Sequence, residues 1–199
     1  MAKIARVLRY AHDETPMGEL DPTKLMGLVA IGEVNGETAL EVTTLQELAK
    51  GERLLTRDGR GYWHEYVVES EEASHELPSG ITHTYYCVWS IQHDLEGTVV
   101  TGMPGTGGTP ATATQALTAA LAGTARWAVG TVSPSTTGSA SFWRLSGWEA
   151  LQKLVEVWGG EVQATITVSG SRVTSRAVDL LTHVGSTIST DRRFDFGRD

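Results

Sequence analysis

The clearest pattern of apolar and polar positions lies in the last third of the chain, after Ser146. Apolar residues recur there every three or four positions, the spacing of one face of a helix: Trp148, Leu151, Leu154, Val155 and Trp158. Ser146 and Glu149 match the Ser-x-x-Glu capping box, which satisfies two backbone amides at a helix start. Gly159 and Gly160 then predict the helix end.

A different period follows this helix. Val162, Ala164, Ile166 and Val168 alternate with polar residues, which predicts a strand with one buried face. The dipeptide Gly170-Ser171 suits a type II′ turn, so residues 172–181 should return antiparallel.

Two further elements are expected just upstream. The segment 110–124 is rich in Ala and has Leu117 and Leu121 four positions apart, which predicts a helix. Gly123 would occupy the first position after the C-cap and so end this helix. Residues 125–132 predict a strand. Residues from about 110 to 185 should therefore form an α+β unit of two helices and about three strands.

The first 95 or so residues instead predict antiparallel strands with little helix. A first strand is expected at 3–10 and a proline-containing, charged loop at 11–24. Asn35-Gly36 predicts a hairpin with a type I′ turn between two apolar runs. The residues Asp58 to Gly61 predict a second hairpin turn.

Residues 80–100 should add one strand or two, and residues 44–51 one helical turn. This pattern is typical of a small barrel or sandwich.

Composition changes at Gly97, where charge almost disappears and Gly, Thr and Pro dominate. Residues 101–110 are therefore predicted to be a linker. The glycines between Gly102 and Thr109 resemble a phosphate-binding loop only in number, because the motif's lysine is missing.

The 199-residue chain carries a formal net charge of -8. Such a charge disfavours nucleic-acid binding on an open surface and suits a surface past which nucleic acid slides. The alternative reading is that the negative charge only keeps the protein soluble. No segment has the roughly 18 apolar residues that span a bilayer, and the N-terminus lacks a secretory apolar region, so we expect a cytoplasmically made product.

No set of catalytic or metal-binding residues stands out, and none is predicted. Cys87, the single cysteine, lies in a predicted strand and should be a buried apolar residue. His83 and His93 flank it at a spacing that places the three side chains too far apart for zinc. The other histidines are His12, His64, His75 and His183. Glu69, Glu71 and Glu72 form a charge run that is typical of a solvated strand end.

The six tryptophans offer the main alternative. They are Trp63, Trp89, Trp127, Trp143, Trp148 and Trp158. Clustered aromatic residues form sugar-binding platforms as well as cores and interfaces. Because Trp148 and Trp158 lie on the apolar helix face, the core is favoured for both, and Trp143 is the freer residue.

Three segments together resemble a known family: Leu121 to Gly130, Ser146 to Glu161, and Arg193 to Asp199. Their Leu-x-Gly-Thr-x-x-Trp-x-Val-Gly, Ser-x-x-Glu-Ala-Leu and Arg-Phe-x-x-Gly-x-Asp patterns resemble the N-terminal hub of siphophage tail-associated proteins, also called prophage tail endopeptidase or phage minor structural proteins. Residues 51–74 are similar to a strand of that family in a looser way.

The resemblance implies a mainly antiparallel α+β fold like that of a contractile-phage baseplate hub. A β-barrel-like tube domain (1–100, with a return strand beginning at about 190–199) would carry an inserted α+β domain (111–188) after the 101–110 linker. It implies a homotrimer at the virion tail tip, assembled in the host cytoplasm. Its partners would be the distal tail protein and the tape measure protein, with genome DNA passing through the lumen unbound.

The resemblance implies no enzymatic activity, cofactor, metal or membrane segment in these residues, because any peptidase or hydrolase of the family lies further downstream. The family's hub continues past the Arg193 segment, so this chain is either part of a longer hub or a short one. Two alternatives stay open: a glycan-binding or wall-degrading module that uses the tryptophans, and the hub of a phage-related injection machine.

Overall fold

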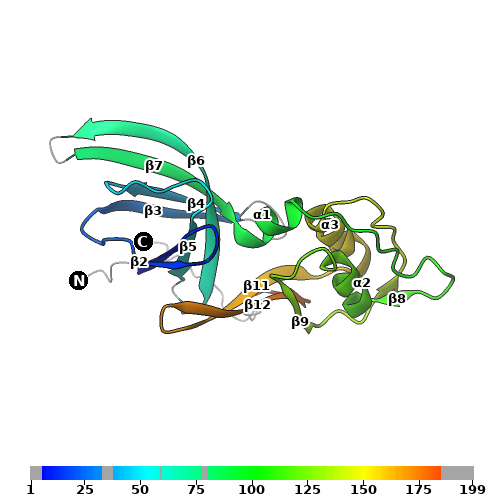
Figure 1. The fold of residues 1–199 in the computed structure, drawn as a ribbon. Coiled ribbons are helices and arrows are strands. Elements are labelled where there is room, and N and C mark those ends of the chain that lie inside the picture. The colour runs from blue at the N-terminus through cyan, green and yellow to red at the C-terminus, as the bar shows by residue number, and fades with distance from the viewer. Residues whose placement is uncertain (1–5, 33–37, 59, 78–79, 185–199) are drawn as a thin grey trace, which may run out of the picture.

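The computed structural model describes residues 6–32, 38–58, 60–77 and 80–184. A seven-stranded sheet occupies one side of the molecule, and two helices with a smaller sheet occupy the other (Figure 1). The helix α1 (Ser90–Glu96) connects the two. In the part of the chain that is described, no helix is long and apolar enough to cross a membrane.

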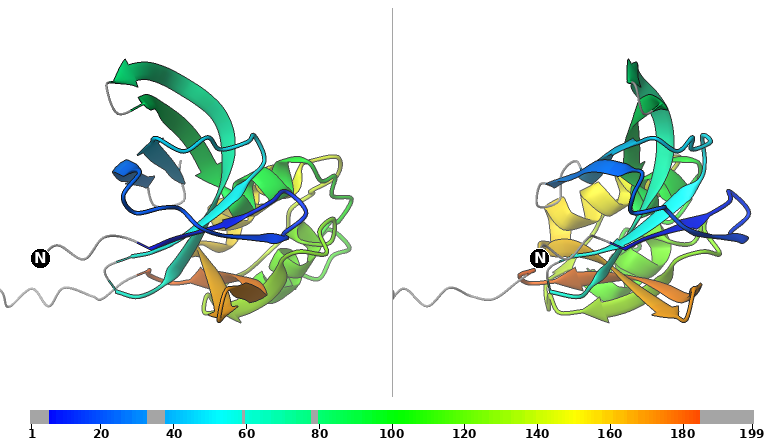
Figure 2. Two further views of the ribbon diagram at one scale, coloured as in Figure 1. Left: turned by 60° about the vertical axis from the view of Figure 1, so that its left-hand side comes forward. Right: turned by 90° about the vertical axis from the view of Figure 1, so that its left-hand side faces the viewer.

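The large sheet is antiparallel throughout, in the order β2-β1-β5-β6-β7-β4-β3. Its strands are β1 (Val7–Tyr10), β2 (Pro16–Glu19), β3 (Leu25–Gly32), β4 (Thr38–Thr44), β5 (Arg53–Arg57), β6 (Trp63–Leu77) and β7 (Gly80–Trp89). The β6–β7 hairpin is the longest and stands out from the rest of the sheet (Figure 2).

The expected hairpins explain most of this sheet. Arg57 pairs with Trp63 across the predicted Asp58 turn, which confirms the β5–β6 hairpin. Gly32 pairs with Thr38, as the second predicted hairpin requires, although Asn35 and Gly36 lie outside the described residues. The mainly antiparallel α+β class is therefore confirmed.

A closed barrel is not present among the described residues, because β2 and β3 form the two ends of the sheet and do not pair with each other. β2 has only four residues, begins at Pro16, and follows an irregularity in its pairing with β1. A proline cannot donate to a ladder, so such a strand ends a sheet. The return strand expected at 190–199 lies outside the described residues.

Three local expectations were wrong. The predicted loop 11–24 contains β2, and residues 44–51, where one helical turn was expected, begin with the last residue of β4 and contain no helix. The segment after Trp89 is the helix α1 instead of strand, with Ile91 and Leu95 buried on one side. Seven residues are too few to display a helical period, so periodicity missed it.

The C-terminal part follows its predicted pattern closely. The helix α3 (Gly147–Trp158) has the expected capping box between Ser146 and Glu149, and Gly159 ends it with φ 75°. Behind it, β11 (Glu161–Ser169) and β12 (Arg172–Leu181) pair antiparallel around Gly170, whose φ is 62°.

The other strands and the helix α2 complete this part. β9 (Ala128–Val132) joins β12 in parallel, and the two-residue strands β8 (Ala111–Thr112) and β10 (Thr137–Gly138) pair with each other. The helix α2 (Ala113–Ala120) starts at a second capping box, Thr112 with Gln115. It ends before the predicted Gly123, which instead lies against Thr98, where an added Cβ would come within 3.0 Å of the threonine side chain.

The buried apolar residues form two clusters. One lies within the large sheet and includes Leu40, Leu54, Tyr66 and Cys87. The other joins the two halves of the molecule. Its members include Leu8 and Leu55 of the sheet, Ile91 and Leu95 of α1, Leu117 of α2, and Leu151 and Trp158 of α3. Apolar packing, the main source of folding free energy, is thus continuous across the halves.

The predicted linker is also packed. The carbonyl of Gly102 accepts from the amide of Phe142 at 2.9 Å, and the carbonyl of Pro104 accepts from that of Ala140 at 2.9 Å. The division into domains at 1–100 and 111–188 stays a prediction.

Trp158 supplies a test of that division. Its side chain is 1 % exposed, lies against Phe142 at a ring distance of 6.4 Å, and donates from Nε1 to the carbonyl of Ala111 at 2.8 Å. We expect Trp158→Ala to cost about 3 to 5 kcal/mol of unfolding free energy through cavity formation. Ser146→Ala should cost about 1 kcal/mol through the lost cap.

Thermal unfolding and segment-resolved hydrogen exchange measure both effects. Protection should fall first in α2, α3 and β11. It should fall far less in β4 and in β7 before Trp89, because their residues Leu40, Val42, Tyr85 and Cys87 belong to the other apolar cluster. Equal loss in all five elements would contradict a separate C-terminal unit.

Candidate functional site

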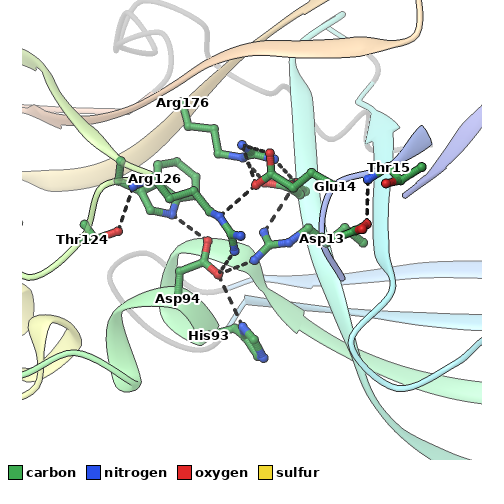
Figure 3. Close-up of polar contacts among 11 residues, drawn as sticks. Asp13, Glu14, Thr15, His93, Asp94, Thr124, Arg126 and Arg176 are labelled. Carbon is green, nitrogen blue, oxygen red and sulfur yellow. Dashed lines mark hydrogen bonds and ion pairs between the residues drawn. The ribbon is translucent and has the colours of Figure 1, made fainter. Parts of the chain in front are cut away.

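A network of charged side chains lies where the large sheet meets α1 and β12 (Figure 3). It contains three acids and three arginines from six different segments: Glu14, Arg53, Glu65, Asp94, Arg126 and Arg176. Residues as far apart in the sequence as Glu14 and Arg176 are thereby joined.

The centre of the network is a bidentate pair between β6 and β12. Arg176 donates from Nε to Glu65 Oε2 and from Nη2 to Glu65 Oε1, both at 2.7 Å. The Glu65 side chain is fully buried, and Arg176 is nearly so. Burial alone would lower the pKa of Arg176, but the hydrogen bonds and charges of Glu65 and Glu14 raise the pKa above its ordinary value. The arginine therefore remains charged in the interior.

Asp94 of α1 forms the second centre. It accepts from Arg53 Nη2, from Arg126 Nη1 at 3.0 Å and from the indole Nε1 of Trp127 at 2.9 Å. Burial would raise the pKa of Asp94, yet these donors, with Arg53 first, lower the pKa below the usual carboxyl value. Asp94 is thus held as a carboxylate that anchors α1 to both halves.

Local backbone structure places the outer members. Glu14 has φ 69°, in the left-handed region, where Asp13 Oδ1 accepts from the amide of Thr15 at 3.0 Å and closes a tight turn (Figure 3). From that turn Glu14 contacts Arg126 Nε at 2.8 Å and Arg176 Nη1 at 3.1 Å. The amide of Arg126 donates in turn to Thr124 Oγ1 at 3.1 Å.

The composition of the network indicates a structural role. Its three positive and three negative groups pair with one another, so each carboxylate is held by at least one arginine. Arg53 is the least well satisfied member: its Nη1 lies 3.5 Å from Glu65, and its Nε has no hydrogen-bond partner among the described residues. The network fixes the position of β12 against β6.

The residues considered for chemistry from the sequence do not converge. His83 Nδ1 contacts Glu71 at 2.7 Å on the β6–β7 hairpin, and His64 Nε2 contacts Asp58 at 3.3 Å beside the β5–β6 turn. His93 lies on α1 instead of on a strand. Across the described ranges no three His, Cys, Asp or Glu side chains gather as a metal site.

Cys87 and the three remaining histidines also lie apart from one another. Burial raises the pKa of the Cys87 thiol to about 12, so at neutral pH it is a protonated, unreactive group. His12 lies beside Gly51, His75 on the β6–β7 hairpin, and His183 at 3.8 Å from Glu161. Each is separate from the others.

An apolar groove lies between the end of β7, one side of α3 and the start of β11. It has a volume of about 260 Å³ and is lined by Trp89, Trp148, Leu151, Gln152, Val155, Glu156 and Val162. Trp148 is buried at 8 % exposure, as its place on the helix face predicts, yet one side of it borders the groove. Sequence reasoning missed this groove because Trp89 comes from a distant strand.

The tryptophans divide as their spacing suggests. Trp148 and Trp158 are buried, and so are Trp89 and Trp127, whereas Trp143 is 53 % exposed. A single exposed indole does not form a platform of several stacked rings.

The strand β3 is the second unusual surface. Its eight residues contain no charge, it ends the sheet, and Met26, Val29 and Ile31 are all exposed. Soluble proteins usually protect such an edge with charge, proline or a bulge. β2 at the opposite end has the proline, whereas β3 has neither charge nor proline and is irregular only at its start, between Leu25 and Gly27.

No protein-family model matches the chain, and no curated protein matches it. Among solved structures, it resembles the crystal structure of the prophage tail protein gp18 from Listeria monocytogenes EGD-e. The sequences are 13 % identical and the TM-score is 0.56, with 98 % of this chain and 56 % of that chain covered. The two proteins therefore share a fold, and this chain spans little more than half of the other's length.

Arg176 tests the structural role of the charge network. Arg176→Met should lower the unfolding free energy by about 3 to 5 kcal/mol, because Glu65 is left buried without its bidentate partner. The matched control is Arg6→Met, which breaks an exposed pair with Glu19 and should cost less than about 1 kcal/mol. Urea unfolding measures both, and equal costs would contradict the role assigned to the network.

Proposed function

We propose that this protein is a structural component of a bacteriophage tail. The proposal is supported by the likeness of nearly the whole chain to the fold of a prophage tail protein. It is also supported by the charge network, which joins segments that are distant in the sequence and whose carboxylates are all paired with arginines. On this proposal the protein belongs to the virion and has no enzymatic activity of its own.

The finer proposal is a homotrimeric tail-tip hub beneath the distal tail protein, in contact with the tape measure protein. The uncharged edge of β3 supports it, because an exposed edge strand without charge or proline is a ready template for pairing with another chain. A net charge of -8 suits a lumen through which DNA passes without binding. The hub of a related injection machine would need the same self-association and the same acidic lumen.

Glycan binding is the second candidate, and the exposed indole of Trp143 favours it. The other tryptophans on the C-terminal half are buried, so a stacking platform of several rings is not formed there. The structural proposal therefore explains more of the molecule.

Assembly gives the direct test. Analytical ultracentrifugation of the full-length protein, at concentrations where tails assemble, should give trimers. Val29→Lys should reduce this association without lowering the melting temperature, because the side chain is exposed and a lysine blocks a free edge. Tyr62→Lys, at another exposed apolar position, is the control and should leave association unchanged. Monomers alone from the unsubstituted protein would refute the hub.

The absence of catalysis gives a second test. Alanine at His64, His83, His93 or Cys87 should change infectivity only as far as it changes folding, since none of them lies in a reactive group of side chains. Infectivity and tail assembly are measured side by side. A variant that assembled normal tails but failed to degrade the cell wall or eject DNA would contradict the proposal.

A further inference from the structure

The groove beside α3 has the size and chemistry to hold one aromatic side chain. Its volume is about 260 Å³, whereas about 150 Å³ holds a benzene ring and drug-sized ligands need about 300 Å³ or more. Trp89, Trp148 and Leu151 are its buried lining residues. An indole therefore fits the groove better than a sugar chain or a cofactor does.

The charge at the rim of the groove narrows the choice of occupant. Glu156 is exposed and is the charged residue of the lining, so the rim attracts a cation. The groove thus favours an aromatic group that has a positively charged neighbour, as a protein segment can have.

The chain presents such a group on its own surface. Trp143 is 53 % exposed, and the guanidinium carbon of Arg144 lies 6.0 Å from the centre of its ring. Trp143 does not line the groove of its own chain. The aromatic ring and the cation are adjacent, as the groove requires.

The backbone holds this pair in a fixed position. Arg144 has φ 62°, which is rare for a residue with a side chain. Its amide donates to the carbonyl of Val100 at 2.9 Å, and the amide of Leu145 donates to Phe142 at 3.0 Å. A preorganised side chain loses little entropy on binding, which favours a role as an anchor.

We propose that Trp143 of one copy inserts into the groove of a second copy, with Arg144 facing Glu156. The proposal rests on the self-association in the proposed function and names a contact that carries it. The two surfaces are different, so the contact is head-to-tail, and repeating it closes a ring or extends a chain. Because each copy carries a charge of -8, the Arg144–Glu156 pair also sets the register between chains that otherwise repel.

The first experiment removes the anchor from the full-length protein. Trp143→Ala should weaken association at least about thirtyfold in sedimentation, the effect of losing a central interface tryptophan. Val99→Ala removes another exposed apolar side chain, 68 % exposed, and should leave association unchanged. Circular dichroism should show both variants folded. Unchanged association of Trp143→Ala would overturn the proposal.

The second experiment exchanges the charges. Arg144→Glu and Glu156→Arg should each weaken association, and the double variant should restore it, because the opposite signs then meet again across the contact. Both residues are exposed, so folding is retained. Failure of the double variant to recover beyond the weaker single variant would contradict the pairing.

The third experiment tests the head-to-tail arrangement. Trp143→Ala keeps the groove and Val155→Asp keeps the anchor, so a mixture of the two should form 1:1 dimers although each alone stays monomeric. If Val155→Asp weakens association while Trp143→Ala does not, then a different occupant fills the groove.

The outcomes separate this contact from the hub itself. Trimers that are indifferent to Trp143 and Glu156 would overturn the contact and leave the hub standing. Association that depends on both residues but is not threefold would support the contact and contradict the hub. A wild-type monomer at tail-assembly concentrations would overturn both.

Discussion

The buried pair between Glu65 and Arg176 is the constraint on which the arrangement of this molecule depends. Glu65 lies in the middle of the large sheet and Arg176 in the C-terminal hairpin, and two hydrogen bonds of 2.7 Å fix one to the other. A buried charge without a partner costs several kcal/mol, so neither side chain can move away alone. Asp94, Arg53 and Arg126 extend the same constraint to α1 and to the start of β9.

Apolar packing supports this connection. Residues of the sheet, of α1 and of both longer helices belong to one buried cluster, which lies against the charge network through Trp127. Apolar burial stabilises the fold but does not fix how two elements are positioned, because it is non-directional. Hydrogen-bonded charge pairs fix that position but add little net stability. Together they join the large sheet to the C-terminal elements. On the proposed function, the surfaces offered to partners include the uncharged β3 edge, the groove beside α3 and the exposed Trp143.

Much of the fold could be predicted where the local pattern is complete within a few residues. The capping box of α3, its apolar face and the alternation of β11 are such patterns, and so are the hairpins around Asp58 and Gly170. Elements that span only about two repeats of their own period escaped prediction. α1 is too short to show a helical repeat, and β2 begins at a proline within a charged segment that is typical of a loop.

The sequence by itself determined the elements whose causes are local: caps, turns, and the faces of strands and helices. It also determined that Cys87 is buried. Only the tertiary structure decided that the seven strands form an open sheet, since pairing between distant strands depends on how the whole chain packs. The charge network and the groove likewise form only when distant segments pack together. Glu14, Glu65, Asp94 and Arg176 carry no shared sequence signal, because the distances that make them a site exist only after the sheet, α1 and the hairpin have come together.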